Sequence, residues 1–450
     1  MVDGAAIWVG DREMRSPLPL DKLEKGFDVV RTSVGHETVA HLLAKRFPLL
    51  HQQIEFAAEL VDKPTPPDLL ATLLAYEKDA IREAVAQGRP TVAVYCPTGA
   101  YRAHIGNLAQ ALRTRGYPCV ALYGTVCEDE FESADNAYYA GNDLVSELDF
   151  IDVFIVPTLM DVLPEAAVKI LFVHDIFDSP LGDENEFRRF ADLFDYFFLP
   201  TTYSMDAFRR VLGARELPDG GERRPPDSRC LIPGGYIRLD RNLAYMRDHP
   251  CRPDAVVYAP TVALPEWGDL ASLPRYGARI VASLLAGLPD LTVIFRPHPH
   301  SLGTDAVGAI VERFGDDPRF VFDDAPSAYM PTYARSRALV TDMSGTAFTY
   351  AFTTLRPVVF FSPAAGEDRG QAGQVRYFSA RDKIGLVTDD LAGLASVVRA
   401  AIEGTEEKGR AIEELRDSVV FNVSRAESYF LDTFPFIAEN RRCPDWSYFR

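Results

Sequence analysis

The sequence predicts an α/β protein with two doubly wound, Rossmann-like domains behind an N-terminal helical extension. From residue 91 onward, short apolar runs of strand length alternate with amphipathic stretches of helix length. This alternation indicates mostly parallel sheets covered by helices on both faces. It occurs in two series, and residues 241–253 between them are predicted to form a hinge. The length of 450 residues and the hydrophobic content of 47% suit a globular chain with several structural units.

Residues 1–90 have a different pattern and are predicted to form the helical extension. Residues 37–61 and 67–86 have the spacing of apolar side chains that is typical of helices, and a proline-rich break lies between them. We expect this segment to pack against the rest of the chain or to mediate homo-oligomerisation rather than to carry chemistry.

The first α/β domain is predicted over residues 91–240. Its expected strands share short buried-type apolar runs and lie at 91–96, 118–122, 153–156, 170–174, 196–199 and 230–233. Its expected helices lie at 104–116, 184–192 and 204–212. The polar, breaker-rich residues 216–228 are predicted to form a loop.

The second α/β domain is predicted over residues 253–405, followed by a helical tail at 406–450. Its expected strands lie at 255–259, 292–295, 320–322, 338–341 and 357–361. Its expected helices lie at 275–287, 306–314, 327–334, 346–355 and 391–402. In such sheets ligands bind beyond the carboxyl ends of the strands, so functional side chains are expected at the strand exits.

Charge and cysteine content exclude several functional classes. The formal net charge is −18, which argues against nucleic acid as the main partner and against broad docking on anionic lipid. The six cysteines form no CxxC pair and no cluster with histidine, as expected for reduced thiols in a cytoplasmic protein. The N-terminus lacks the layout of a signal peptide, and no apolar run is long enough for a transmembrane segment.

Two strand exits of the second domain predict an anion site. After the strand at 338–341, Asp342, Ser344, Gly345 and Thr346 precede a helix, and a helix N-terminus with small polar residues suits a pyrophosphate. A simple helix cap explains these residues equally well. After the strand at 292–295, the run Arg296-Pro-His298-Pro adds a cation and an imidazole at the same edge, which favours phosphate binding.

Two strand exits of the first domain complete the set of candidates. His174 and Asp175 follow the strand at 170–174, and a histidine at such an edge suits a general base at neutral pH, although a lining role without proton transfer fits as well. The turn at 96–106 contains glycines without GxGxxG spacing, so it is only a weak dinucleotide signal.

Several segments, taken in order, resemble the CDP-glycerol glycerophosphotransferase family of teichoic-acid polymerase type, which has the GT-B fold. His174-Asp-Ile stands where that family has His-Gly-Thr, and Gly235-Tyr-Ile-Arg-Leu-Asp240 is similar to its Gly-Tyr-Pro-Arg-Asn-Asp. Its Tyr-Ala-Pro-Thr block stands unchanged at 258–261. Its Leu-His-Pro and Thr-Asp-Tyr-Ser-Ser elements resemble residues 296–299 and 341–345.

The resemblance implies transfer of an alditol phosphate from a CDP-linked donor to a hydroxyl of a glycan or lipid-linked acceptor, with release of CMP, in surface-glycan or capsule assembly. It implies His174 as the base on the acceptor side, with Asp175 beside it. Donor phosphates and nucleotide would be bound by residues of the second domain: Thr261, Arg296, His298, Asp342, Ser344, Gly345 and Thr346. Arg238 and Asp240 would line the cleft.

The residues leave other functions open. A GT-B glycosyltransferase of Kdo type or one using another nucleotide sugar, a nucleotide-sugar epimerase, and a non-catalytic nucleotide-binding member all fit the same architecture. No resident cofactor or protein metal site is predicted, and a Mg²⁺ ion on a diphosphate, which needs few protein ligands, stays an open alternative. The donor, the acceptor, single addition against polymerisation, and the oligomeric state are not fixed by the sequence.

Overall fold

The computed structural model describes residues 6–9, 12–15, 67–124, 137–176, 192–213, 215–218, 220–263, 270–325, 328–363 and 376–450. The chain forms two compact units. The first comprises Met1–Gly99, Asn107–Val156 and Met160–Lys169, and the second comprises Ala100–Gly106, Pro157–Leu159 and Ile170–Arg450. All of the candidate functional residues lie in the second unit. No helix in the described part of the chain is both long and apolar enough to cross a bilayer.

The second unit contains a six-stranded sheet whose neighbouring strands are all parallel. Its strands are β10 (Ala255–Tyr258), β11 (Thr292–Phe295), β12 (Phe320–Phe322), β13 (Ser336–Thr341), β14 (Val358–Phe361) and β15 (Gly385–Thr388). Their order in the sheet is β12-β11-β10-β13-β14-β15. The order reverses between β10 and β13, and such a switch point is where open α/β sheets bind ligands.

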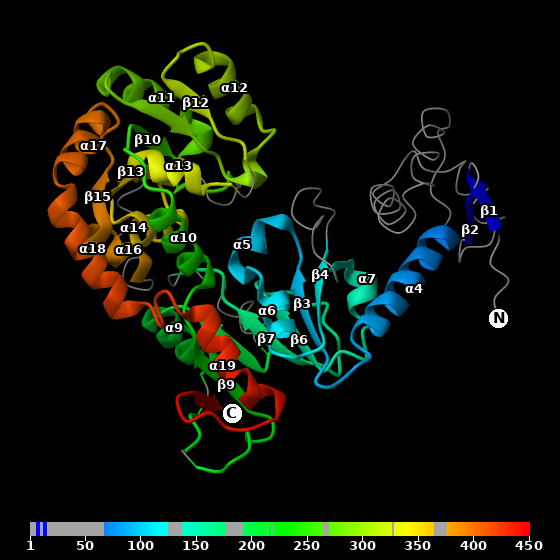
Figure 1. Ribbon diagram of the computed structural model, residues 1–450. Coiled ribbons are helices and arrows are strands. Elements are labelled where there is room, and N and C mark those ends of the chain that lie inside the picture. The colour runs from blue at the N-terminus through cyan, green and yellow to red at the C-terminus, as the bar shows by residue number, and fades with distance from the viewer. Residues whose placement is uncertain are drawn as a thin grey trace. The chain divides into compact units, whose positions relative to one another are not determined.

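Alternating side chains of these strands enter two separate cores, one on each face of the sheet. Val256 and Tyr258 pack with α11 (Leu273–Gly287), α12 (Asp305–Phe314) and α17 (Leu394–Glu403). Ala255 and Val257 pack with α13 (Met330–Arg335), α14 (Thr346–Thr354), α16 (Arg376–Ile384) and α18 (Thr405–Val419), and Figure 1 shows these helices around the strands. Helices on both faces confirm the doubly wound prediction for this domain.

Each unit also contains further parallel strands. In the second unit β8 (Tyr196–Leu199) pairs in parallel with β7 (Val168–Phe172) and β9 (Arg229–Pro233), and β16 (Ser447–Phe449) adds antiparallel to β9. In the first unit β3 (Val92–Cys96) pairs in parallel with β4 (Cys119–Tyr123) and β6 (Val153–Val156), and β5 (Ala137–Tyr139) adds to β4. The α/β fold class is therefore confirmed.

Of the N-terminal 90 residues, the structure describes a hairpin of β1 (Ala6–Val9) and β2 (Arg12–Arg15) and the helix α4 (Pro67–Ala84). The helix at 67–86 was therefore predicted correctly. Glu77 of α4 is fully buried and accepts a hydrogen bond from the Tyr139 backbone N–H at 2.8 Å. The helices predicted at 37–61 and 184–192, and much of the segment predicted to mediate oligomerisation, lie outside the described residues.

Helix α10 (Ile237–Asp248) occupies most of the segment predicted as a hinge at 241–253, and the sequence did not predict this helix. Only Ile237, Leu239 and Asn242 of this helix are buried, so its apolar stripe is too narrow for the sequence pattern to show. The helix predicted at 104–116 is instead two helices, α5 (Arg102–Ile105) and α6 (Leu108–Thr114), because Gly106 between them has φ 55°. Strands β1 and β2, which lie in the predicted helical extension, and strands β5, β15 and β16 were not predicted.

Candidate active site

His174, which follows strand β7, has one ring nitrogen bound and one directed away from that bond. Its Nδ1 lies 2.9 Å from the carbonyl oxygen of Pro157. A carbonyl oxygen can only accept, so Nδ1 carries the proton and Nε2 keeps the lone pair in the neutral ring. The ring makes an edge contact with Tyr101, with 5.1 Å between ring centres. His174 therefore has the tautomer that a general base requires.

Asp175 lies on the side of the free nitrogen. Its Oδ2 is 4.0 Å from Nε2 of His174, and both side chains are partly exposed, at 36% for His174 and 40% for Asp175. At that distance the two groups share no hydrogen bond. Asp175 therefore does not orient the ring; the Pro157 carbonyl does.

His104 of α5 lies next to His174, with 5.6 Å between the ring centres. The Tyr236 hydroxyl donates to the His174 backbone carbonyl at 2.7 Å, so its oxygen accepts from Nδ1 of His104 at 3.0 Å. Burial lowers the pKa of His104 well below its usual range, and the charges of Arg238 and His174 act in the same direction. His104 is thus a neutral, buried member of the network that holds the His174 backbone.

Arg238 of α10 connects this network to the core of the six-stranded sheet through Tyr329. One of its guanidinium nitrogens, Nη1, lies 3.3 Å from Nε2 of His104, and Nε donates to the Tyr329 hydroxyl at 2.8 Å. Its guanidinium carbon lies 4.3 Å from the centre of the Tyr329 ring, and that of Arg296 lies 5.9 Å from the same ring. Tyr329 in turn donates to Asn242 at 2.7 Å.

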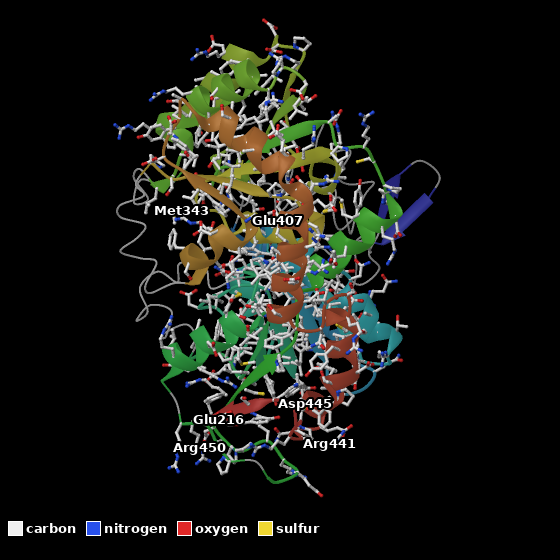
Figure 2. The ribbon with its side chains drawn as sticks, turned by 90° about the vertical axis from the view of Figure 1, so that its left-hand side faces the viewer. Glu216, Met343, Glu407, Arg441, Asp445 and Arg450 are labelled. Atoms are coloured by element: carbon white, nitrogen blue, oxygen red, sulfur yellow. The ribbon has the colours of Figure 1, made fainter. Side chains whose placement is uncertain are left out.

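At the carboxyl end of β13, Asp342 fixes the backbone of the sheet edge. Its carboxylate accepts from the backbone N–H groups of Thr261, Ser272 and Met343 and from the Ser272 hydroxyl, at 2.8–2.9 Å. Asp342 is 2% exposed, and its burial raises the pKa of the carboxyl. Met343, labelled in Figure 2, marks this exit. The hydrogen bond between Thr261 and Asp342 thus links the carboxyl ends of β10 and β13 at the switch point, and the carboxylate of Asp342 is buried.

Ser344, Gly345 and Thr346 are all partly exposed and form the start of α14. The Thr346 N–H lies 3.4 Å from the Ser344 hydroxyl, and the Thr346 hydroxyl is 2.6 Å from that of Tyr333. Gly345 is the cap residue, and no side chain caps this helix. The arrangement leaves small side chains and backbone N–H groups at a helix N-terminus, which suits an anion.

Arg296 and His298 follow β11 but have different surroundings. Arg296 pairs with Asp323 at 2.7 Å and donates to the Ala325 carbonyl at 2.6 Å, so its charge is largely compensated. His298 Nδ1 accepts from the His300 backbone N–H at 3.2 Å. Nε2 therefore carries the proton of the neutral ring. Burial, and secondarily the charge of His300, lowers the pKa of His298 to about 4.

Asp240, which the sequence assigned to the cleft, caps another helix. Its Oδ2 accepts from the Ala426 backbone N–H at 2.6 Å, at the start of α19 (Ala426–Ala438). Its Oδ1 is buried with no hydrogen-bond partner among the described residues. Burial raises the pKa of Asp240 to about 6.

Direct contacts join many of the candidate residues through tyrosines. His174, His104, Tyr236 and Arg238 form one continuous set of contacts, and Tyr329 continues it to Arg296. Tyr329 also contacts Tyr333, whose hydroxyl reaches Thr346. His298 is not part of this set, because its hydrogen bond and its ring contact among the described residues are both with His300.

Sequence reasoning missed His104, Tyr236 and Tyr329. His104 and Tyr236 lie inside segments that the sequence singled out, at 96–106 and 235–240, but nothing in the local pattern distinguishes a buried network from a packed turn. Among the described residues, no group of three or more histidine, cysteine or acidic side chains could hold a metal ion.

Comparison with solved structures shows the fold of the chain. The wall teichoic acid polymerase TagF aligns at a TM-score of 0.58 with 16% identity, over 83% of this chain and 95% of that one. A putative UDP-N-acetylglucosamine 2-epimerase from Listeria monocytogenes aligns at 0.53 with 12% identity, over 80% and 99%. The S. aureus MnaA–UDP structure aligns at 0.52 with 12% identity, over 78% and 98%.

No protein-family model matches the chain, and no curated protein has a matching sequence. These structural similarities, all below 25% identity, show the fold of the chain and no more specific property. The chain has the two-domain, Rossmann-like α/β architecture of the GT-B fold, as the sequence predicted.

Proposed function

We propose that the protein transfers an alditol phosphate, such as glycerol phosphate, from a CDP-linked donor to an acceptor hydroxyl on a glycan or lipid-linked molecule. The observation that carries the proposal is the state of His174, whose Nδ1–H is bound to Pro157 while Nε2 is left to take a proton. A variant of the wall teichoic acid polymerase TagF has been solved after a soak with CDPG, and the likeness of this chain to that structure supports the donor class.

The proposed reaction uses each group in the state the structure gives it. His174 Nε2 takes the proton of the acceptor hydroxyl as its oxygen attacks the alditol phosphorus, so that a P–O bond forms and the P–O bond to CMP breaks. The α14 N-terminus with Ser344 and Thr346 and the Nε2–H of His298 would donate to the phosphate oxygens as charge builds on the leaving CMP. No resident cofactor is needed, and assays with and without Mg²⁺ test whether an ion on the diphosphate assists.

Nucleotide selectivity tests the donor site. The purified protein is heated in the presence of CMP, CDP, CDP-glycerol, UDP, GDP or ADP, in parallel with His298→Ala. A ligand at about 100 times its dissociation constant adds roughly 2.7 kcal/mol of stability. Stabilisation by cytidine nucleotides that His298→Ala loses is the expected result, and selective stabilisation by UDP or GDP would contradict the CDP-linked donor.

A second candidate is an enzyme that acts on a nucleotide sugar, either a glycosyltransferase or an epimerase. The specific observation in its favour is the likeness to the UDP-N-acetylglucosamine 2-epimerase and MnaA–UDP structures. Incubation with UDP-N-acetylglucosamine, followed by NMR of the sugar, distinguishes it, because an epimer or a glycosidic product contains no new phosphodiester.

A further inference from the structure

Arg238 carries a positive charge that no carboxylate among the described residues neutralises. Its partners in that part of the chain are the Tyr329 hydroxyl, Nε2 of His104 and the face of the Tyr329 ring. Arg296 differs, because it pairs with Asp323 at 2.7 Å. A partly buried cation without a counter-ion is costly to desolvate and is commonly kept for an anionic ligand.

The contacts of Arg238 orient its guanidinium but use only some of its N–H groups. The bond to Tyr329 uses Nε–H, and the contact with His104 uses one N–H of Nη1. Among the described residues, the second N–H of Nη1 and both N–H groups of Nη2 have no hydrogen-bond acceptor. Nη1 and Nη2 are the pair of neighbouring nitrogens that binds a phosphate in bidentate fashion.

His104 is suited to hold this guanidinium. Its Nδ1–H is donated to Tyr236, so Nε2 presents a lone pair to Arg238. The low pKa of His104, caused by burial and by the charge of Arg238, keeps the imidazole neutral near pH 7. The same imidazole lies 5.6 Å, between ring centres, from His174, so a phosphate on Arg238 would lie beside the proposed base.

We propose that Arg238 binds the phosphoryl group that the acceptor hydroxyl attacks, and that His104 and Tyr329 are positioning residues for its guanidinium. This assignment rests on the proposed function, which requires the attacked phosphorus to lie within reach of a hydroxyl bound at His174. Arg238 would then stabilise negative charge on the phosphoryl oxygens as the new P–O bond forms.

The difference in affinity between CDP and CMP tests the assignment, because only CDP has the β-phosphate that stands for the attacked group. Calorimetry with each nucleotide is run on the wild-type chain, Arg238→Gln and the control Arg247→Gln. Arg247 lies on the same helix but is exposed and pairs with Asp248 at 2.9 Å. Arg238→Gln is expected to lose at least about tenfold in CDP affinity and to keep CMP affinity within about twofold, while Arg247→Gln changes neither.

His104→Phe removes the contact with Arg238 and tests the positioning role. It is expected to weaken CDP and not CMP, and the double variant with Arg238→Gln is expected to be no weaker than Arg238→Gln alone, because both act through one contact. Arg238→Lys keeps the charge without the planar fork and is expected to recover only part of the CDP affinity. Additive losses would overturn the role of His104.

Equal losses of CDP and CMP in Arg238→Gln, or no loss of either, would overturn the assignment of Arg238 while leaving the proposed donor intact. The UMP and UDP pair and inorganic pyrophosphate separate the remaining outcomes. If the wild type binds pyrophosphate or UDP but no cytidine nucleotide, and Arg238→Gln loses that binding, the proposed donor fails and the phosphate role of Arg238 stands. If none of these binds, both are overturned.

Discussion

His104 and His174 are neighbours, but their different hydrogen-bond partners suit them to different roles. In His104 both ring nitrogens are occupied, by Tyr236 and by Arg238, whereas among the described residues only Nδ1 of His174 has a hydrogen bond, to the Pro157 carbonyl. An imidazole with both nitrogens occupied can position its neighbours but has no site for a substrate proton. Proton transfer is therefore proposed for His174 alone.

Asp175 lies beside the free nitrogen of His174 rather than behind its ring, so we expect it to accept a hydrogen bond from the acceptor. Asp175→Asn is predicted to raise KM for the acceptor severalfold and to change kcat less than His174→Ala does. Transfer kinetics with glycerol as the acceptor, with CDP-glycerol at saturation, measure this. A loss confined to kcat would instead indicate an effect of Asp175 on the base.

Asp240 predicts a pH effect on stability. Burial raises its pKa from 3.8 to about 6, so between these values the folded state binds more protons than the unfolded state. Its contribution to stability is therefore full below about pH 4 and is lost as pH rises through about 6. Asp240→Asn keeps an acceptor for the Ala426 N–H and cannot ionise.

The variant Asp240→Asn is accordingly predicted to gain stability relative to the wild type as pH rises from about 4 to 6, and the gain should be constant above that. Thermal unfolding across this range measures the difference. Asp248→Asn, on the exposed end of the same helix, is the control and should give no such gain; a flat difference for Asp240→Asn would contradict the account.

Part of the site was predictable residue by residue. His174, His298 and Ser344 follow apolar runs, and chain order alone assigns them to strand exits. Asp342 and Asp240 have the residue type of a site, but the carboxylate of Asp342 and Oδ2 of Asp240 accept hydrogen bonds from backbone N–H groups. His104, Tyr236 and Tyr329 acquire their partners only through tertiary contacts, which no local pattern encodes.

At the scale of an element, the position of α10 depends on the glycine that precedes this helix. Gly235 has φ +103°, and a Cβ there would lie 2.5 Å from the Phe421 backbone oxygen. Gly303 has a comparable φ of +79°, but a Cβ at that residue would meet nothing within 4 Å. Both sites disfavour a side chain by about 1–2 kcal/mol through their backbone conformation, and only Gly235 adds a steric clash.

Gly235→Ala is therefore predicted to lower the thermal transition clearly more than Gly303→Ala does. It should also weaken CDP binding, because it displaces the helix that carries Arg238. Differential scanning calorimetry and nucleotide titration of the two variants check this. Equal destabilisation by the two substitutions would show that the contact with Phe421 does not constrain α10.

The sequence identified the buried strands well and the polar helices poorly. Strands such as β10 and β14 are continuous apolar runs that are buried along their whole length, which is a strong local signal. Helix α10 buries few side chains among many charges, and β16 has only three residues and depends on pairing with β9. Elements stabilised mainly by tertiary contacts are those that local patterns miss.

At the scale of the whole molecule, buried neutral histidines predict a loss of stability in mild acid. The pKa of His298 is lowered from 6.5 to about 4, and that of His104 is lowered well below 6.5, by burial in both cases. Between pH 6.5 and 4 the unfolded chain binds more protons at these sites, so stability falls as pH falls.

His298→Gln is predicted to flatten this part of the pH–stability profile, measured by thermal unfolding from pH 7 to 4.5. His249→Gln removes an exposed histidine and serves as the control, which should leave the slope unchanged. A His298→Gln profile as steep as that of the wild type would remove His298 from the explanation.

His174 is proposed to activate the hydroxyl that attacks a CDP-linked donor. The most direct measurement is ³¹P NMR of the protein with CDP-glycerol and glycerol, comparing the wild type with His174→Ala. The wild type is expected to give equal amounts of CMP and a new phosphodiester. His174→Ala is expected to react at a rate at least about 10²-fold lower, with CMP affinity unchanged by calorimetry. Phosphodiester formation at an undiminished rate in His174→Ala, or no release of CMP by the wild type, would contradict the proposed role of His174.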